Sequence, residues 1–441
     1  MSRSPGAAPA LGETVELSIE KAVYRGRGLG RVGGCVVFVR RTFPGDRLQA
    51  RVKAVHGGWA EAEPIEILQP SPARRPAPCP NGPECGGCSY QDIDYEEQLR
   101  LKESVLRESL ARAGAPFEGV IERIASPEQG WRLRATLHFA VAAGGLRLGV
   151  RDEGSHRVTG SGDCQQLSPR MNEAVRALRE RLAPWNGLHP RLRGLDLFEA
   201  PDGSALVGSL VTALRPHELR ELAALGRQVP GLTGFGIETH PARLHWLHGD
   251  PHVEASVLGT RLRAHVSSFF QPNRFLLEPL AREVRELVPR SGGRILDLYS
   301  GVGLFSLPLA ARDDAAVIAV EHAATSCEDA RANARRQRLP VRVIESDVAE
   351  ALAALPAEAD ERIVMDPPRT GAGPVVVDRV AARRPGAVVY VSCDPPTLGR
   401  DLARFATHGY RPDCVRLIDQ FPNTYHVETL VRLRPEADRK L

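Results

Sequence analysis

The sequence predicts an α/β protein with three folded parts: a small β-barrel, a β-rich central domain and a C-terminal domain with a doubly wound parallel sheet. Within the first 70 residues, short alternating apolar and polar runs are separated by glycine-rich turns, which is typical of a small antiparallel barrel. From about residue 263, apolar runs such as RILDLYS and AVVYVSCD alternate with helical segments. That alternation indicates a parallel sheet with helices on both faces.

Changes in composition suggest where these parts begin and end. Pro-rich and Gly-rich stretches, which are typical of linkers, lie at the N-terminus and around residues 69–88. Asp94 and Glu97 match a capping box at the start of a helix, and Gly114 can end that helix. The predicted parts are 1–12, a flexible N-terminus; 13–70, the barrel; 71–92, a cysteine-bearing segment joined to the central domain; 93–116, the helix; 117–262, the central domain; and 263–441, the C-terminal domain.

Composition limits the class of protein. The formal net charge of +4 is too small to indicate nucleic-acid binding by itself. No run reaches the roughly 18 apolar residues of a membrane helix, and the N-terminus lacks the apolar core of a secretory signal. We therefore expect a cytoplasmic protein without membrane association. In that compartment its eight cysteines predict metal binding where they cluster, and core packing or catalysis where they are isolated.

Glycine and acidic residues follow the predicted strands of the C-terminal domain. The first strand leads into a turn with Gly301 and Gly303, and glycines there let a ligand approach the backbone and the helix N-terminus. The second strand ends in Glu321, which can accept hydrogen bonds from ribose hydroxyls. Asp347 follows the third strand and is a candidate for contact with an adenine edge. Open α/β sheets bind ligands at this end of their strands.

The identity of the ligand follows from two further positions. Ser306 stands where the dinucleotide fingerprint has its third glycine, and Asp366 opens an Asp-Pro-Pro-Arg run after another strand. Together with the glycine turn and Glu321, this favours S-adenosylmethionine over NAD as the cofactor. The alternative for Glu321 and Asp347 is that they only cap the helices that follow them.

Cys393 and Glu428 are the candidate catalytic residues. Cys393 ends the strand VVYVS, and its thiolate could add to C6 of a uracil, so that C5 can attack a sulfonium methyl. The helix that follows is expected to lower the pKa of the thiol. Glu428 begins the last strand and is the candidate base for the C5 proton, with a pKa raised by desolvation. The target base must be flipped out to reach them. The alternatives are a core cysteine and a surface glutamate.

Four of the other cysteines suggest a metal centre. Cys79, Cys85 and Cys88 are spaced as C-x5-C-x2-C, and Cys164 stands 76 residues further on. Three close thiols with a distant fourth can bind a [4Fe–4S] cluster. Four thiolates can equally bind structural zinc, which prefers two short C-x2-C pairs. The spacing alone leaves both open.

In these motifs the chain resembles the bacterial RNA uracil-5-methyltransferases, specifically the iron–sulfur members that act on 23S ribosomal RNA. The resemblance covers nearly the whole chain and implies an OB-like TRAM domain for the barrel and a Rossmann-like methyltransferase domain at the C-terminus. The runs VSCDPPTLGRDL and DQFPNTYHVET match the family segments that carry the nucleophile and the base. The resemblance therefore places these roles on Cys393 and Glu428, and it implies that the helix at 93–116 packs on the catalytic domain.

The resemblance also implies cofactors and their ligands. The run FFQPN matches a family motif that contacts S-adenosylmethionine, and Leu304 departs from the polar residue of some members. The implied cofactor positions are Gln271, Tyr299, Gly301, Glu321, Asp347 and Asp366, and the implied [4Fe–4S] ligands are Cys79, Cys85, Cys88 and Cys164.

Three other functions are consistent with parts of the sequence. A cytosine-5 methyltransferase also needs a cysteine and a carboxyl group, but the HVET segment argues against it. An N-methyltransferase would have an aromatic residue in place of Arg369. An RNA-binding factor with a degenerate catalytic domain would not need Cys393 and Glu428. We expect an enzyme that acts on RNA, most specifically 23S rRNA, as a monomer without an obligate protein partner.

Overall fold

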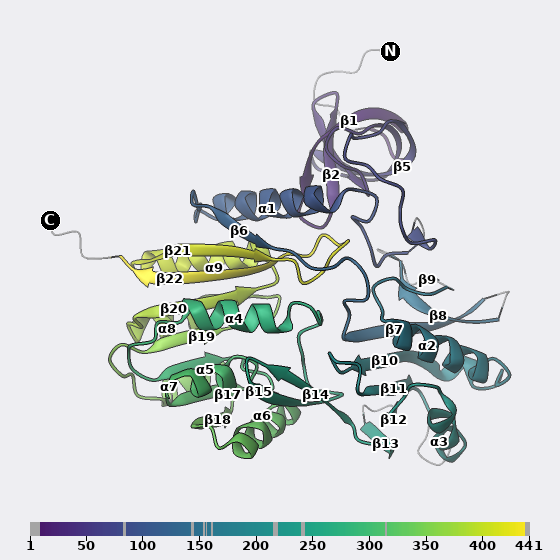
Figure 1. The fold of residues 1–441 in the computed structure, drawn as a ribbon. Helices are drawn as coiled ribbons and strands as arrows, with labels where there is room; N and C mark the ends of the chain where they lie inside the picture. Colours follow the sequence, from purple (N-terminus) through teal and green to yellow (C-terminus); the bar gives the residue numbers. More distant parts are fainter. Residues whose placement is uncertain are drawn as a thin grey trace.

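The computed structural model describes residues 9–82, 85–142, 145–152, 155, 157–159, 162–214, 219–239, 243–313 and 315–436. In the view of Figure 1 the barrel lies at the upper right, the larger C-terminal sheet at the left and the central sheet at the lower right. The helices are α1 (Tyr95–Arg112), α2 (Pro169–Leu182), α3 (Leu219–Gln228), α4 (Leu277–Leu287), α5 (Ser306–Asp313), α6 (Ala324–Gln337), α7 (Val348–Ala354), α8 (Gly373–Ala382), α9 (Pro395–Thr407) and the 3-10 helix η2 (His189–Arg191). None of the helices in these ranges is long and apolar enough to cross a membrane.

The N-terminal barrel is closed, with strand order β1-β2-β3-β5-β4, as the sequence predicts. Side chains alternate between its interior and the solvent, so that Val15, Leu17 and Ile19 lie in its core. Gly28 and Gly30 allow the close packing of β2, since a Cβ atom would lie 2.3 Å from Thr42 Oγ1 or 2.4 Å from a main-chain carbonyl oxygen. The strands are β1 (Thr14–Val23), β2 (Arg27–Val32), β3 (Cys35–Arg40), β4 (Arg47–His56) and β5 (Trp59–Gln69).

The central domain is a seven-stranded sheet of order β13-β12-β11-β10-β7-β8-β9. Helices α2 and α3 cover it with an apolar core that includes Leu178, Leu222 and Phe235. Its strands are β7 (Arg134–Ala142), β8 (Gly145–Arg151), β9 (Val158–Thr159), β10 (Leu192–Glu199), β11 (Leu206–Thr212), β12 (Gly234–Thr239) and β13 (Arg243–His248). A separate hairpin of β14 (His252–Val257) and β15 (Thr260–His265) follows and packs with α6.

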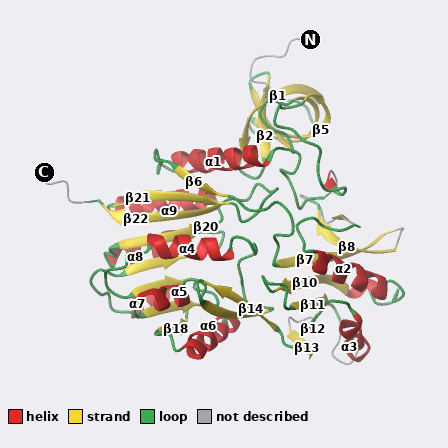
Figure 2. Ribbon diagram, viewed as in Figure 1, coloured by secondary structure: helices red, strands yellow, loops and turns green. Residues whose placement is uncertain are grey.

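The C-terminal sheet has eight strands in the order β18-β17-β16-β19-β20-β22-β21-β6, and the five from β18 to β20 are parallel. Successive residues of these strands enter different cores: Ile295 faces one and Leu296 the other. Helices cover both faces, which confirms the doubly wound prediction (Figure 2). The strands are β16 (Ile295–Leu298), β17 (Val317–Glu321), β18 (Val341–Glu345), β19 (Arg362–Met365), β20 (Ala387–Ser392), β21 (Tyr410–Ile418) and β22 (Glu428–Pro435).

Two elements from the early chain join this sheet. Strand β6 (Ile121–Ile124), which the sequence pattern groups with the central domain, pairs in parallel with the edge strand β21 instead. Helix α1 packs on α9. Lys102 of α1 and Asp419 form an ion pair of 2.5 Å with both side chains fully buried. Asp94 is the N-cap residue of α1, but its side chain makes no capping hydrogen bond, contrary to the capping-box expectation.

The order of the parallel strands determines where a ligand can bind. The chain runs outward from β16 through β17 to β18 and then returns to β19 on the other side of β16. The crevice outside the carboxyl ends of β16 and β19 is therefore a topological switch point, where such sheets bind ligands. Tyr299 and Asp366 directly follow these two strands.

Candidate active site

One cavity of about 870 Å³ opens at this edge of the C-terminal sheet and extends to the central domain. It collects residues from the carboxyl ends of β16, β17, β19 and β20, from the start of β22 and from the segment before α4. Of the predicted catalytic and cofactor residues, those that line it are Gln271, Tyr299, Gly301, Glu321, Asp366, Cys393 and Glu428.

The two catalytic candidates meet because of the direction of their strands. Cys393 follows the last residue of β20, and Glu428 is the first residue of β22. These strands are antiparallel neighbours, with Ser392 opposite Thr429, so the end of one lies beside the start of the other. Glu428 is only 4% exposed. This register brings a thiol and a carboxyl group to one cavity wall from positions 35 residues apart in the sequence.

The turn after β16 is shaped for close contact with a ligand. Tyr299 has a left-handed backbone with φ of 62°, which is costly for a residue with a side chain and is common at functional sites. Gly301 is also left-handed, and a Cβ atom there would meet no atom within 4 Å. Its N–H donates to Glu321 Oε2 at 2.9 Å. The turn and the acid after β17 thus form one wall of the cavity.

Asp347 differs from the other predicted cofactor residues. Its side chain caps α7 by accepting from the N–H groups of Ala349 and Glu350. Burial, and then the charge of Asp347, raise the pKa of Tyr299, but Asp347 is not part of the cavity wall. Glu321 also accepts from the backbone N–H groups of His322 and Ala323, yet it lines the cavity. The capping alternative therefore describes the observed contacts of Asp347 better than those of Glu321.

Two carboxyl groups, the buried Glu428 and the half-buried Asp366, influence each other in the cavity. Burial raises the pKa of Asp366 to about 7, and the neighbouring Asp297 adds to this effect. Gln271 opposes it by donating from Nε2 to Asp366 Oδ2 at 3.0 Å. Burial, and then the charge of Asp366, raise the pKa of Glu428 well above its ordinary value. Asp366 can consequently exchange a proton near neutral pH, and Glu428 holds its proton to a higher pH than an exposed glutamate does.

The expectation of a lowered pKa for Cys393 is wrong. Burial, and then the charges of Glu428 and Asp366, raise the pKa of the thiol to about 12. The N-terminus of α9 gives little help because Asp394 caps it, with Oδ1 accepting from Thr397 N at 3.0 Å. The charge and hydrogen bond of Arg369 act in the opposite direction and favour the thiolate.

Arg369→Ala should therefore make Cys393 less reactive. Without the guanidinium the pKa of the thiol rises further, and one pKa unit lowers the thiolate fraction at pH 8 about tenfold. We expect iodoacetamide to alkylate Cys393 about tenfold more slowly in the variant. The rate would be measured by mass spectrometry of the peptide that contains Cys393. In the wild type the rate should rise with pH from 7 to 11. The control is Arg342→Ala, which removes an arginine from the edge strand β18 of the same sheet. An unchanged alkylation rate in Arg369→Ala would contradict the proposed effect of Arg369 on the thiol.

The four clustered cysteines line a second, smaller pocket beside the first. None of the four forms a disulfide. The charges of Cys164, Cys85 and Cys79 add to the burial that raises the pKa of Cys88 to about 12, so the four sulfurs lie near one another. Cys164 also lines the larger cavity, which makes the two sites adjacent. In the described part of the chain, no three His, Cys, Asp or Glu side chains are arranged to hold a metal ion.

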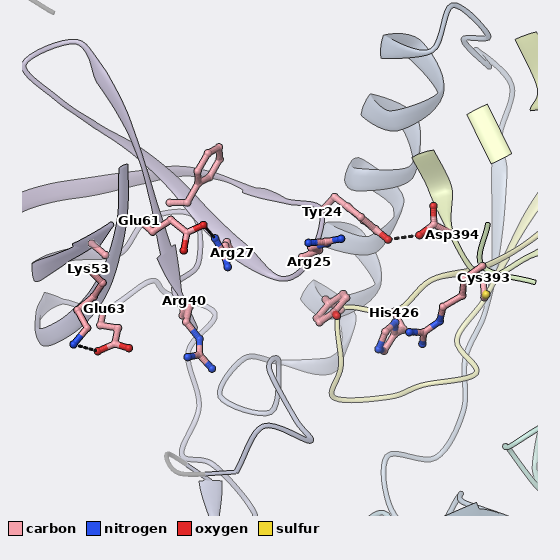
Figure 3. Close-up of a pocket in the computed structure, with 14 residues that line it drawn as sticks. Tyr24, Arg25, Arg27, Arg40, Lys53, Glu61, Glu63, Cys393, Asp394 and His426 are labelled. Atoms are coloured by element: carbon pink, nitrogen blue, oxygen red, sulfur yellow. Dashed lines mark hydrogen bonds and ion pairs between the residues drawn. The ribbon is translucent and has the colours of Figure 1, made fainter. Parts of the chain in front are cut away.

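A third cavity, a groove of about 540 Å³, lies between the barrel and the C-terminal domain (Figure 3). Cys393 and Arg369 line both this groove and the larger cavity. The barrel contributes Arg25, Arg27 and other charged residues to its wall. Cys393 can therefore be approached from two sides.

Sequence reasoning missed Arg369, Tyr24 and His426 as site residues. Arg369 follows the Asp-Pro-Pro run, where the sequence pattern shows only that an aromatic residue is missing. His426 lies in the HVET segment, and burial together with the positive charge of Arg369 lowers its pKa to about 3, so it is neutral. Tyr24 comes from the barrel and donates to Asp394, a contact that no local pattern indicates.

The C-terminal sheet with this cavity at its switch point has the fold of a methyltransferase. Residues 254–436 match the model of the tRNA (uracil-5-)-methyltransferase family, and residues 10–65 match the TRAM domain. The crystal structure of the Pyrococcus abyssi tRNA (uracil-54, C5)-methyltransferase in complex with S-adenosyl-L-homocysteine aligns with a TM-score of 0.76 and 25% identity. The alignment covers 95% of this chain and 99% of that one.

Two bacterial relatives match over nearly their full lengths. The 23S rRNA (uracil(1939)-C(5))-methyltransferase RlmD of Pseudomonas fluorescens is 35% identical, over 95% of this chain and 94% of the relative. The enzyme of the same description from Halomonas elongata is 34% identical, over 96% and 90%. The chain therefore belongs to the family of S-adenosylmethionine-dependent RNA (uracil-5-)-methyltransferases.

Proposed function

We propose that this enzyme methylates C5 of one specific uridine in 23S ribosomal RNA, through a covalent bond between Cys393 and C6. The observation that carries the proposal is the cavity in which Cys393, Glu428 and Asp366 lie together with Gln271. The rRNA relatives support the choice of substrate. No relative of this kind supports a cytosine-5 methyltransferase or an N-methyltransferase. That the enzyme is a monomer stays a prediction.

Each side chain has a distinct role in the proposed reaction. Cys393 Sγ adds to C6 of the flipped uracil, and Arg369 favours the thiolate that does so. S-adenosylmethionine would supply the electrophilic methyl group: C5 takes it up as its bond to the sulfonium sulfur breaks, and S-adenosylhomocysteine is the leaving group. Glu428 then accepts the proton from C5, and the electron pair of the C5–H bond forms the C5–C6 double bond as the bond to Sγ breaks. The thiolate is thereby restored.

The cofactor residues position the donor in this proposal. Glu321 lies after β17, where a carboxylate can accept from ribose hydroxyls. Gly301 leaves room for close approach of the ligand to the backbone. Gln271 and Asp366 are held together by their hydrogen bond near Cys393. The groove beside the barrel offers the RNA a route to the other side of Cys393.

The test of this function is a trapped adduct. In RNA that contains 5-fluorouridine at the target, C5 carries fluorine in place of the proton that the base removes, so elimination stops and the enzyme stays attached. We expect the purified enzyme and S-adenosylmethionine to form a denaturation-resistant complex with a fluorinated 23S rRNA fragment around position 1939, linked at Cys393. 5-Fluorocytidine at the target is the control. Active methylation of unmodified RNA without any adduct on the fluorinated RNA would refute the covalent mechanism.

We further propose that Cys79, Cys85, Cys88 and Cys164 bind a [4Fe–4S] cluster. Four thiols that share a pocket are a suitable donor set for it. Gln166 Nε2, which lies 2.8 Å from Cys88 Sγ, provides a polar neighbour. A bound cluster would link the segment before α1 to the central domain covalently.

This centre predicts a coloured protein. Anaerobic purification should give a brown enzyme with about four iron atoms per chain, measured by metal analysis. Cys164→Ser should lose most of the iron, because one of four ligands is removed. Cys35→Ser, in the barrel and away from this pocket, is the control and should keep it. A colourless enzyme with zinc instead would contradict the proposal.

A further inference from the structure

The turn between β1 and β2 of the barrel contacts two segments of the catalytic domain. The hydroxyl group of Tyr24 donates to Asp394 Oδ2, as drawn in Figure 3. At Gly26, a Cβ atom would lie 2.9 Å from the side chain of Tyr425. One short turn of the barrel is therefore packed against both the segment after Cys393 and the segment before Glu428.

The first contact bears on the nucleophile. Asp394 is the next residue after Cys393, and its other carboxylate oxygen caps α9 through Thr397. The backbone N–H of Asp394 donates to Ser392 Oγ at 3.3 Å. Thr397 Oγ1 in turn donates to the carbonyl oxygen of Arg369 at 3.1 Å. Tyr24 thus holds Asp394 in place, and Asp394 in turn helps to fix the backbone on both sides of Cys393.

The second contact bears on the base. Tyr425 lies three residues before Glu428, its backbone N–H donates to Ser89 Oγ at 3.1 Å, and its ring lies 4.3 Å from that of His426. Gly26 has a left-handed backbone with φ of 69°, which favours glycine, and it has no side chain to displace Tyr425. The turn thereby fits closely against the segment that leads to Glu428.

We propose that the β1–β2 turn fixes the nucleophile relative to the base, and that Tyr24 is the positioning residue for Cys393 through Asp394. The barrel then contributes to the rate of bond formation in addition to any contact with RNA. Burial and the neighbouring Asp394 raise the pKa of Tyr24, so its hydroxyl group stays protonated and remains a donor. This inference rests on the proposed function, since the formation of the Cys393–C6 bond is its main readout.

Tyr24→Phe removes the donor and little else. We expect the maximal rate of adduct formation at saturating fluorinated RNA to fall about tenfold, because small displacements of reacting groups are costly. The Kd for RNA should stay within about twofold. Tyr410→Phe is the matched control, because it removes a buried hydroxyl group that donates to Pro385 O at 2.8 Å. Tyr410 lines neither of the two cavities that Cys393 lines.

Gly26→Ala tests the second contact. The added methyl group must displace Tyr425, and we expect a loss of maximal rate of similar size. Gly58→Ala is its control, since Gly58 is also left-handed, with φ of 99°, but has no neighbour within 4 Å. The control variant shares the backbone strain without the contact and should retain the wild-type rate.

A double-mutant cycle and an RNA-free measurement complete the test. In Asp394→Ala the further change Tyr24→Phe should have no additional effect, because its partner is gone. Alkylation of Cys393 by iodoacetamide should change at least about threefold in Tyr24→Phe and not in Tyr410→Phe. If the wild type formed no adduct, the proposed function would fail, while alkylation would still decide the inference. The inference would be overturned if Tyr24→Phe left both the maximal rate of adduct formation and the alkylation rate unchanged, or if it weakened only the affinity for RNA.

Discussion

Cys393→Ala is expected to abolish methylation, with a loss of more than about 10⁴-fold in kcat. Uracil C5 is a poor nucleophile until a thiolate has added to C6, and the described cavity wall offers that position no second thiol besides Cys164, which belongs to the proposed cluster. The measurement is the transfer of labelled methyl groups to rRNA, with the affinity for RNA determined separately. The affinity should remain, because the side chain is small and its removal leaves the charged groove intact.

The control for Cys393→Ala is Cys414→Ala. Cys414 is a partly buried cysteine on β21 that packs against one of the two apolar cores. Its replacement should leave both the rate and the adduct unchanged. Retained turnover in Cys393→Ala would mean that the nucleophile is another group or that the reaction proceeds without a covalent bond.

Glu428→Gln should separate the two halves of the reaction. Gln has nearly the same size but cannot accept the C5 proton as a carboxylate does, so the adduct should form and be methylated but not resolve. We expect turnover to fall about 10²- to 10⁴-fold and adduct on unmodified RNA to accumulate. Gel electrophoresis under denaturing conditions would show this adduct directly.

The pH dependence of the wild-type methylation rate is a second test of the role of Glu428. Its pKa is raised by burial and by Asp366, and it must be ionised to act as a base. The rate should therefore rise with pH as the carboxyl group loses its proton, and Glu428→Gln should lose this part of the pH dependence and keep the rise that comes from the thiol of Cys393. Gln271→Ala is a useful comparison, because it removes a contact of Asp366 and leaves Glu428 in place. Normal turnover in Glu428→Gln would assign the base to a different residue.

The fold could be predicted because its signals are local. The alternation of β1 and the fully buried runs of β16, β19 and β20 follow from short stretches of sequence. The carboxyl ends of the parallel strands share one edge, which is why the residues after them could be grouped without a structure. The meeting of Cys393 with Glu428 depends in addition on the pairing of β20 with β22, to which the family resemblance pointed.

The remaining features depend on contacts between distant segments. The pairing of β6 with β21 and the bond from Tyr24 to Asp394 join positions about 300 or more residues apart, and no periodicity encodes them. The sequence predicts a lowered pKa for Cys393, and this prediction is wrong for a related reason. A helix N-terminus can be predicted from sequence, but its occupation by Asp394 and the proximity of two carboxyl groups cannot.

The position of β6 has a consequence for synthesis on the ribosome. This strand leaves the exit tunnel nearly 300 residues before its partner β21, so the nascent sheet cannot be completed until all of that intervening chain has been synthesised. Contacts of such long range slow folding. Until β6 docks, β21 has an unpaired edge that could join other strands. The barrel and the intervening central domain each have a core of their own and can meanwhile fold, so the C-terminal sheet would be the last part to be completed.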